Sequence, residues 1–167
     1  MKFLAGLLAG ALLVLLGAYL FIAFGGVSMM TSAPPLPFEK RLARVALRAS
    51  IGRAAEQKDP LPFTDANMAA GARVYKQQCA LCHGLPGKDK TAIAKGMFPE
   101  PPQLFVDPVT DDPEGVTYWK VTHGIRLSGM PGFTSTLSET DRWQVTMLMA
   151  HADKLSPSVG AALGQTP

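Results

Sequence analysis

The longest uninterrupted run of apolar residues lies at the start of the chain, from Phe3 to Phe24, and Lys2 is the only charged side chain before it. At 22 residues, the run is long enough to cross the hydrocarbon core of a bilayer, which takes about 20 residues in a helix. It is longer than the apolar part of a secretory signal, about 7–15 residues. We therefore expect a membrane-spanning anchor that is retained, with a cleavage site in 27–33 as the alternative.

The charges around this run predict its orientation. Lys2 and the α-amine are the only positive charges before it, and positively charged flanks stay in the cytoplasm. Everything after Phe24 would then lie on the outer side. Gly6 and Gly10 share one helical face, which suits a docked partner subunit but also fits the general abundance of glycine in membrane helices.

A spacer and a basic amphipathic stretch follow. Residues 25–37 are rich in Gly, Ser and Pro, which predicts an extended linker. The stretch 38–57 has helical periodicity. Its apolar face holds Phe38, Leu42, Val45 and Ala49, and its basic face holds Arg41, Arg44 and Arg48. Residues 38–58 carry six basic and two acidic side chains, a net charge of +4, so contact with anionic lipid, contact with a partner subunit and a solvated face all remain open.

The rest of the chain predicts three more helices. Thr64 or Asp65 can cap a helix that starts near residue 66, and a capping-box pattern at 138–141 starts another that runs to about residue 153. A short helix is expected over 118–124. Five prolines between 99 and 113 predict an irregular loop, and Pro157 is expected to stop further helix.

No stretch shows the alternation of a strand, so an all-α chain is expected. We divide it into a transmembrane anchor over 1–25, a linker with the basic helix over 26–63, a helical domain over 64–156 and a loose tail over 157–167. Residues 59–167 carry nine basic and eleven acidic side chains, so this domain is not basic and nucleic acid is not an expected partner.

The candidate chemistry lies in one pentapeptide, Cys-Ala-Leu-Cys-His over 79–83. This spacing is the attachment signature of a c-type haem. Two thiols on one helical turn can both reach the haem vinyl groups, and His83 follows Cys82 directly, where its imidazole can bind the iron from below. Aromatic residues make up only 8% of the chain, and a buried haem would add apolar mass to a thin core.

Other uses of these cysteines fit less well. A thioredoxin-like pair would need a βαβ pattern nearby. A structural zinc would need four nitrogen or sulfur ligands, but Cys79 and Cys82 are the only cysteines and His83 is the only histidine close to them. One covalently bound haem c is therefore the expected cofactor.

The opposite side of the iron needs a ligand or stays open. Met130 stands in Gly-Met-Pro-Gly over 129–132, where glycine lets the backbone approach a flat cofactor and proline fixes the turn. Met97, in an earlier loop, is the next candidate. Met147 and Met149 are expected in the core of a helix pair.

Together these motifs resemble the class I cytochrome c family. Tyr75 stands four residues before the first cysteine, the segment 79–84 reads Cys-Ala-Leu-Cys-His-Gly, and 124–131 reads Gly-Ile-Arg-Leu-Ser-Gly-Met-Pro. The resemblance covers about residues 64–156, and membrane-tethered members of the family exist.

The resemblance implies a small α-helical fold wrapped around the covalent haem. It also implies that a proline carbonyl after the motif accepts the second N–H of His83, which orients the ring. Pro102 matches this role best, and Pro101 stays open. The first and last helices of the fold would cross near Gly71, Tyr75 and Trp143.

These expectations favour one-electron transfer. With His83 and Met130 on its two sides, the iron would have no vacancy for a substrate. We expect a non-enzymatic carrier or cytochrome subunit of a respiratory redox complex, on the periplasmic side of a bacterial inner membrane, with donor and acceptor proteins as partners. The alternatives are a peroxidase-like enzyme or sensor with a labile methionine, and a haem with a purely structural role.

Overall fold

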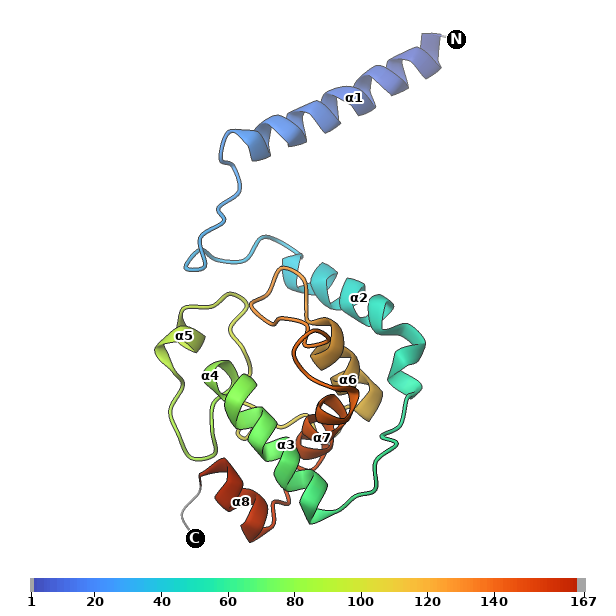
Figure 1. Ribbon diagram of the computed structural model, residues 1–167. Coiled ribbons are helices and arrows are strands. Elements are labelled where there is room, and N and C mark those ends of the chain that lie inside the picture. The colour runs from blue at the N-terminus through green and yellow to red at the C-terminus, as the bar shows by residue number, and fades with distance from the viewer. Residues whose placement is uncertain (1, 165–167) are drawn as a thin grey trace. The chain divides into compact units, whose positions relative to one another are not determined.

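The structure, a computed structural model, describes residues 2–164, and within that range it holds helices and loops but no strand (Figure 1). The expected all-α class is therefore confirmed for the described residues. The elements are α1 (Lys2–Ala23), α2 (Glu39–Ile51), the 3-10 helix η1 (Gly52–Glu56), α3 (Asp65–Gln78), α4 (Ala80–His83), α5 (Ala92–Lys95), α6 (Glu114–His123), α7 (Glu139–Ala150) and α8 (Pro157–Leu163). The chain divides into two compact units, and the boundary in the sequence falls between Lys40 and Arg41.

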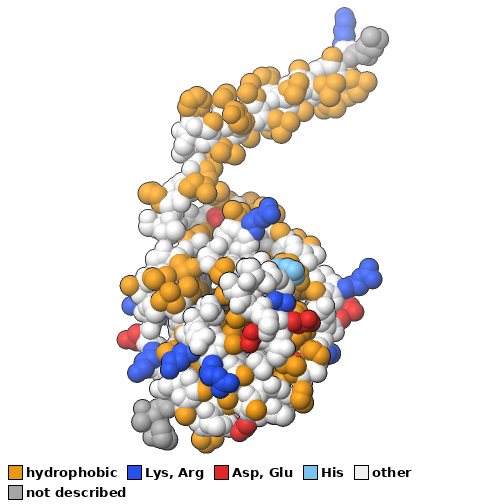
Figure 2. All heavy atoms as spheres, in the orientation of Figure 1, with side chains coloured by type: hydrophobic (Ala, Val, Ile, Leu, Met, Phe, Trp, Pro, Cys, Tyr) orange, Lys and Arg blue, Asp and Glu red, His pale blue; other side chains and the backbone are white. Residues whose placement is uncertain are grey.

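The first unit contains α1, which has no charged residue after Lys2 and is therefore apolar all round; Figure 2 shows one face of it. Its mean hydropathy reaches 2.4 and none of that stretch is buried against other parts of the protein. A helix that is apolar all round is typical of a membrane span, because it has no polar face to turn toward water. Its length and composition suffice for crossing a membrane, and a signal sequence would satisfy the same test.

The second unit is built on the crossing of α3 over α7 (Figure 1). The Thr64 side chain starts α3 by accepting a 3.2 Å hydrogen bond from the backbone N–H of Asn67. Ser138 starts α7 as half of a capping box with Asp141, as the sequence pattern predicts. The buried side chains at the crossing come from both helices: Met68, Ala72 and Tyr75 on one, and Val145, Leu148 and Met149 on the other.

Gly71 allows the two helices to approach this closely. A Cβ at Gly71 would overlap the backbone carbonyl oxygen of Gln144 and lie 3.2 Å from the backbone nitrogen of Val145. Any larger residue would push α3 off α7. The crossing near Gly71 and Tyr75 that the family resemblance implies is thus present, and Trp143 of α7 stacks on Tyr118 of α6 with ring centroids 3.7 Å apart.

The expected loose tail from residue 157 is wrong for the part of it that is described. Pro157 begins α8 instead of ending the helical structure, because a proline in the first turn loses no hydrogen bond there. Val159 and Leu163 are fully buried against the core, and each contributes roughly 1.5–3 kcal/mol of stability. Residues 165–167 of that predicted tail lie outside the described residues.

The basic helix is shorter than the sequence indicates and belongs to the second unit. α2 ends at Ile51, because Gly52 takes a positive φ of 49° and the chain continues as η1. The 3-10 turn packs on α6, where a Cβ at Gly115 would overlap the carbonyl oxygen of Ala54. The compact unit starts at Arg41 and so includes α2 residues and η1 together with the domain predicted from residue 64.

Two other helix boundaries differ from the prediction. α6 starts at Glu114, directly after Pro113, and so extends four residues further toward the N-terminus than the expected 118–124. α7 ends at Ala150, where the backbone of His151 leaves the helical region with φ −125° and ψ 24°. The short helices α4 and α5 were not predicted as separate elements.

We expect Gly71→Ala to lower the free energy of unfolding of the haem-loaded protein by about 1–3 kcal/mol, because the added methyl group overpacks the α3–α7 crossing. Denaturant unfolding of the full chain in detergent measures this. Gly96→Ala is the matched control: a Cβ there has its nearest neighbours at an ordinary 3.6 Å, and the backbone is right-handed at φ −91°. Equal losses in the two variants would contradict the argument.

Candidate functional site

The Cys-x-x-Cys-His segment lies on one helical turn at the end of α3. Cys79 closes α3 by bonding its N–H to the Tyr75 carbonyl at 2.8 Å. The carbonyl of Cys79 then accepts from the backbone N–H groups of Cys82, at 3.1 Å, and His83, at 2.9 Å. The turn thus brings both thiols and the imidazole to one end of the core helix. Neither cysteine is in a disulfide, and both are half-buried.

Burial raises the pKa of the Cys79 thiol to about 12, and the neighbouring Cys82 adds to the shift. A redox-active dithiol needs the opposite, a lowered thiol pKa that makes the nucleophilic thiolate available. The described residues also hold no group of three or more His, Cys, Asp or Glu side chains that could bind a metal ion. Both observations count against the thioredoxin-like and zinc interpretations.

His83 is held in one orientation by the loop that follows the motif. Its Nδ1 lies 2.9 Å from the carbonyl oxygen of Pro102, and since a carbonyl only accepts, Nδ1 donates. Burial lowers the pKa of His83, and the bond to Pro102 opposes this with a smaller effect. The ring is therefore neutral at neutral pH and leaves Nε2 with a lone pair for a metal. Of the two prolines considered, Pro102 makes this bond.

Gln103 fastens this loop to the motif, and the sequence analysis missed it. Its Nε2 donates to the Cys82 carbonyl at 3.1 Å, and the neighbouring Leu104 N–H donates to the His83 carbonyl at 3.3 Å. Gly84, with φ 76°, makes room, because a Cβ there would overlap Oε1 of Gln103. A buried glutamine gives no periodic signal, so only the folded chain reveals this role.

Tyr75 bonds to the residue that follows the motif. It is fully buried, and its hydroxyl donates to the carbonyl oxygen of Gly84 at 2.8 Å. Its ring meets the ring of Phe105 edge-on, with centroids 5.1 Å apart. Burial raises the pKa of the Tyr75 phenol above its ordinary value of 10, so the phenol stays neutral and remains a donor. Tyr75 thus ties α3 to the chain just after the motif.

Met130 lies on a loop that closes on itself. Its carbonyl accepts from the Ile125 N–H at 3.1 Å, and its own N–H donates to the Ser128 hydroxyl at 3.2 Å. Gly124 begins the loop with φ 69°, and a Cβ there would lie only 2.6 Å from the backbone of Gly132. The side chain of Met130 is half-buried against the core, as is Cys79.

Met97 lies beside the same loop. The site of a Cβ at Gly129 is taken by the terminal methyl group of Met97, so the runner-up methionine packs against the residue that precedes Met130. Only glycine fits at 129 while Met97 keeps this place. The side chain of Met97, which follows α5, therefore lies beside the loop between α6 and α7 that carries Met130.

The donor set consists of two free thiols, a neutral imidazole with one available nitrogen, and a methionine thioether on a loop packed against the same core. Sulfur and imidazole are the side-chain ligands and attachment points of a c-type haem. An all-helical domain with a Cys-x-x-Cys-His turn ending its first core helix defines a c-type cytochrome domain.

Comparison with known families agrees with this class. The family model described as cytochrome c oxidase, cbb3-type, subunit III matches residues 66–149, just over half of the 167 residues. The chain therefore belongs to this cytochrome c family, whose domains carry haem c. A search of curated proteins gave no significant match.

We expect Tyr75→Phe to lower the free energy of unfolding by about 1–3 kcal/mol, because the buried Gly84 carbonyl loses its partner. The wild-type protein should also lose stability as pH rises above about 10, where the unfolded chain ionises Tyr75 and the folded chain does not. The variant should lack this part of the decline. Denaturant unfolding across pH measures both effects.

Tyr118→Phe is the control for this experiment. Among residues 2–164, the Tyr118 hydroxyl accepts one long hydrogen bond, 3.5 Å from Arg142, and the ring is stacked on Trp143. Its removal should leave stability nearly unchanged. If Tyr118→Phe lowered the free energy of unfolding as much as Tyr75→Phe, the buried hydrogen bond to Gly84 would not account for the effect of Tyr75→Phe.

Proposed function

We propose that this protein transfers single electrons through one covalently bound haem c, held by Cys79 and Cys82 as thioethers. When bound, haem c supplies a one-electron couple between ferrous and ferric iron. His83 would bind the iron through Nε2 and Met130 through its sulfur. The observation that carries the proposal is the His83–Pro102 hydrogen bond of 2.9 Å beside two free thiols on the same turn.

The chain's own residues would fix the geometry in both oxidation states. Pro102 fixes the ring and tautomer of His83, which also makes the imidazole a better donor. Gln103 and Tyr75 tie that loop and turn together through the Cys82 and Gly84 carbonyls. A site held this firmly needs little rearrangement when its charge changes by one, which favours electron transfer over substrate chemistry.

We also propose the setting in which the electron moves. α1 would anchor the chain in a bacterial inner membrane with a single span, and the domain from Arg41 onward would work on the periplasmic side. A tether keeps the domain concentrated near membrane partners. Its donor and acceptor would be redox proteins there, with the chain acting as a carrier or as the non-catalytic cytochrome subunit of a respiratory complex.

We expect Met130→Ala to lower the reduction potential and to let the ferrous protein bind carbon monoxide, because a sulfur ligand to the iron is lost. Potentiometric titration and optical spectra of the haem-loaded protein measure this. The wild-type ferric protein should be low-spin, with a methionine–iron charge-transfer band that the variant lacks. A high-spin resting spectrum would favour the peroxidase-like or sensor alternative.

Two variants control for the choice of methionine. Met147→Leu replaces a buried core methionine on α7 with a side chain of similar volume and should leave the potential and the band unchanged. Met97→Leu tests the runner-up. Loss of the band in Met97→Leu, with Met130→Ala unaffected, would move the axial ligand to Met97.

We expect the full-length holoprotein to resist extraction from membranes by alkaline carbonate, because α1 spans the bilayer. With a protease site inserted within residues 28–33, cleavage should make the haem domain extractable by carbonate. Cleavage should occur only when the protease is added to the outside of spheroplasts, which is the periplasmic side. The uncut protein with the inserted site is the control. Extraction of the uncut protein, or a mature mass that lacks α1, would show that the segment serves as a cleaved signal.

A further inference from the structure

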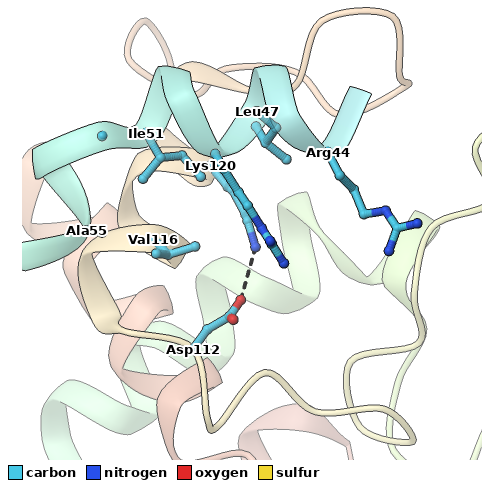
Figure 3. Close-up of a pocket in the computed structure, with 9 residues that line it drawn as sticks. Arg44, Leu47, Ile51, Ala55, Asp112, Val116 and Lys120 are labelled. Atoms are coloured by element: carbon cyan, nitrogen blue, oxygen red, sulfur yellow. Dashed lines mark hydrogen bonds and ion pairs between the residues drawn. The ribbon is translucent and has the colours of Figure 1, made fainter. Parts of the chain in front are cut away.

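α2 is attached to the second unit by one edge only. Leu47 is half-buried and Ile51 is 7% exposed. Both face Val116 of α6 and Ala55 of η1 across a pocket of about 340 Å³ (Figure 3). Lys120 reaches down from α6 to Asp112 in the same pocket, at 3.0 Å. This is therefore the edge of α2 that faces α6 and η1.

The edge that packs is not the one that the sequence marks as apolar. Leu42 is 65% exposed and Val45 is 59% exposed, and Ala49 is exposed too. With 3.6 residues per turn, these three point about 170° away from Leu47 and Ile51. They form a continuous apolar strip, which we call the outer stripe (Leu42, Val45 and Ala49), on the side of α2 opposite the pocket.

A basic side chain borders the outer stripe. Arg41 stands next to it along the helix, whereas Arg44 (Figure 3) and Arg48 line the pocket. Residues 38–58 carry a net charge of +4, whereas 59–167 carry a net charge of −2. An anionic surface would therefore attract the domain by α2 and repel the rest of it.

We propose that the outer stripe of α2 lies on the anionic lipid surface of the membrane, with Arg41 at lipid phosphates. This rests on the proposed anchoring by α1. Only 15 residues separate Ala23 from Glu39, a reach of at most about 50 Å, so the bilayer surface is always within range. Apolar residues inserted at the headgroup level with arginines beside them are the pattern of interfacial helices.

A protein partner fits the outer stripe less well. Three short side chains on one helix cover far less than the roughly 1,000 Å² that a specific protein interface needs. A lipid surface needs no such area from a tethered domain, since the tether already supplies a high local concentration. Because Leu47 and Ile51 face α6 and η1, contact of the outer stripe with lipid would also favour one orientation of the haem domain on the membrane.

The test uses full-length holoprotein with the protease site within residues 28–33, reconstituted into protein-free liposomes and cut afterwards. Sedimentation then reports, by haem absorbance, how much of the released domain stays with the lipid. On vesicles with about one third phosphatidylglycerol at low salt, we expect most of it to stay, and about 1 M salt should release it. On pure phosphatidylcholine vesicles it should leave.

Paired variants identify the surface. Leu42→Gln with Val45→Gln, and Arg41→Glu, should each lower the partition coefficient about tenfold while the haem spectrum stays unchanged. Val106→Gln, at an exposed apolar site elsewhere, and Arg73→Glu, which makes the same charge change at another exposed site, should lower it far less.

Three outcomes would overturn the proposal. The cut domain could leave all vesicles, or the control variants could lower the partition coefficient as much as the test variants. The cut domain could also stay on native membranes and leave liposomes, which would assign the outer stripe to a protein partner. A wrong assignment of α1 as the membrane anchor is detected by a different result, the extraction of the uncut chain by carbonate. The affinity of the cut domain for lipid is measured whether or not α1 is the anchor.

Discussion

The close approach of α3 to α7 at Gly71 is the constraint on which the haem domain depends. α3 carries the attachment motif at its end, so the position of Cys79 and His83 is set by where α3 lies on α7. The backbone contact with Gln144 leaves no space for a side chain, which fixes that position within a narrow range. α8 then packs on α3 and α6 on α7, so the other core helices take their places from this one crossing.

The site adds two loops to that helical frame, and both are held by hydrogen bonds in which a backbone atom takes part. The loop with Pro102 is tied to the motif through Gln103 and through the Leu104 N–H. The loop with Met130 is closed by its own hydrogen bonds, and its backbone at Gly132 lies against Gly124, which has no side chain in the way. The backbone, amide and hydroxyl groups that make these bonds do not titrate near neutral pH. They therefore suit a site whose ligand positions must stay constant while the charge at its centre changes.

The sequence predicts the parts of this protein that depend on local chemistry. The attachment motif, the caps at Thr64 and Ser138 and the apolar N-terminal run each leave a short signature with one physical reason. Pro157 does not, because proline both ends helices and begins them, and only the burial of Val159 and Leu163 decides between the two. Gln103 leaves no signature at all, since its role depends on a carbonyl 21 residues away.

α2 shows why amphipathic periodicity alone can mislead. Its apolar positions occupy two opposite edges, and the hydrophobic pattern favours the edge with Leu42 and Val45, yet Leu47 and Ile51 pack on the domain. The inner edge gains from Val116 and from the close fit of η1 at Gly115, contacts that the sequence of α2 does not contain. One edge of α2 faces the domain and the other leaves Leu42 and Val45 exposed. For the membrane anchoring that we propose, the bilayer is the surface that suits both this apolar edge and the positive charge along α2.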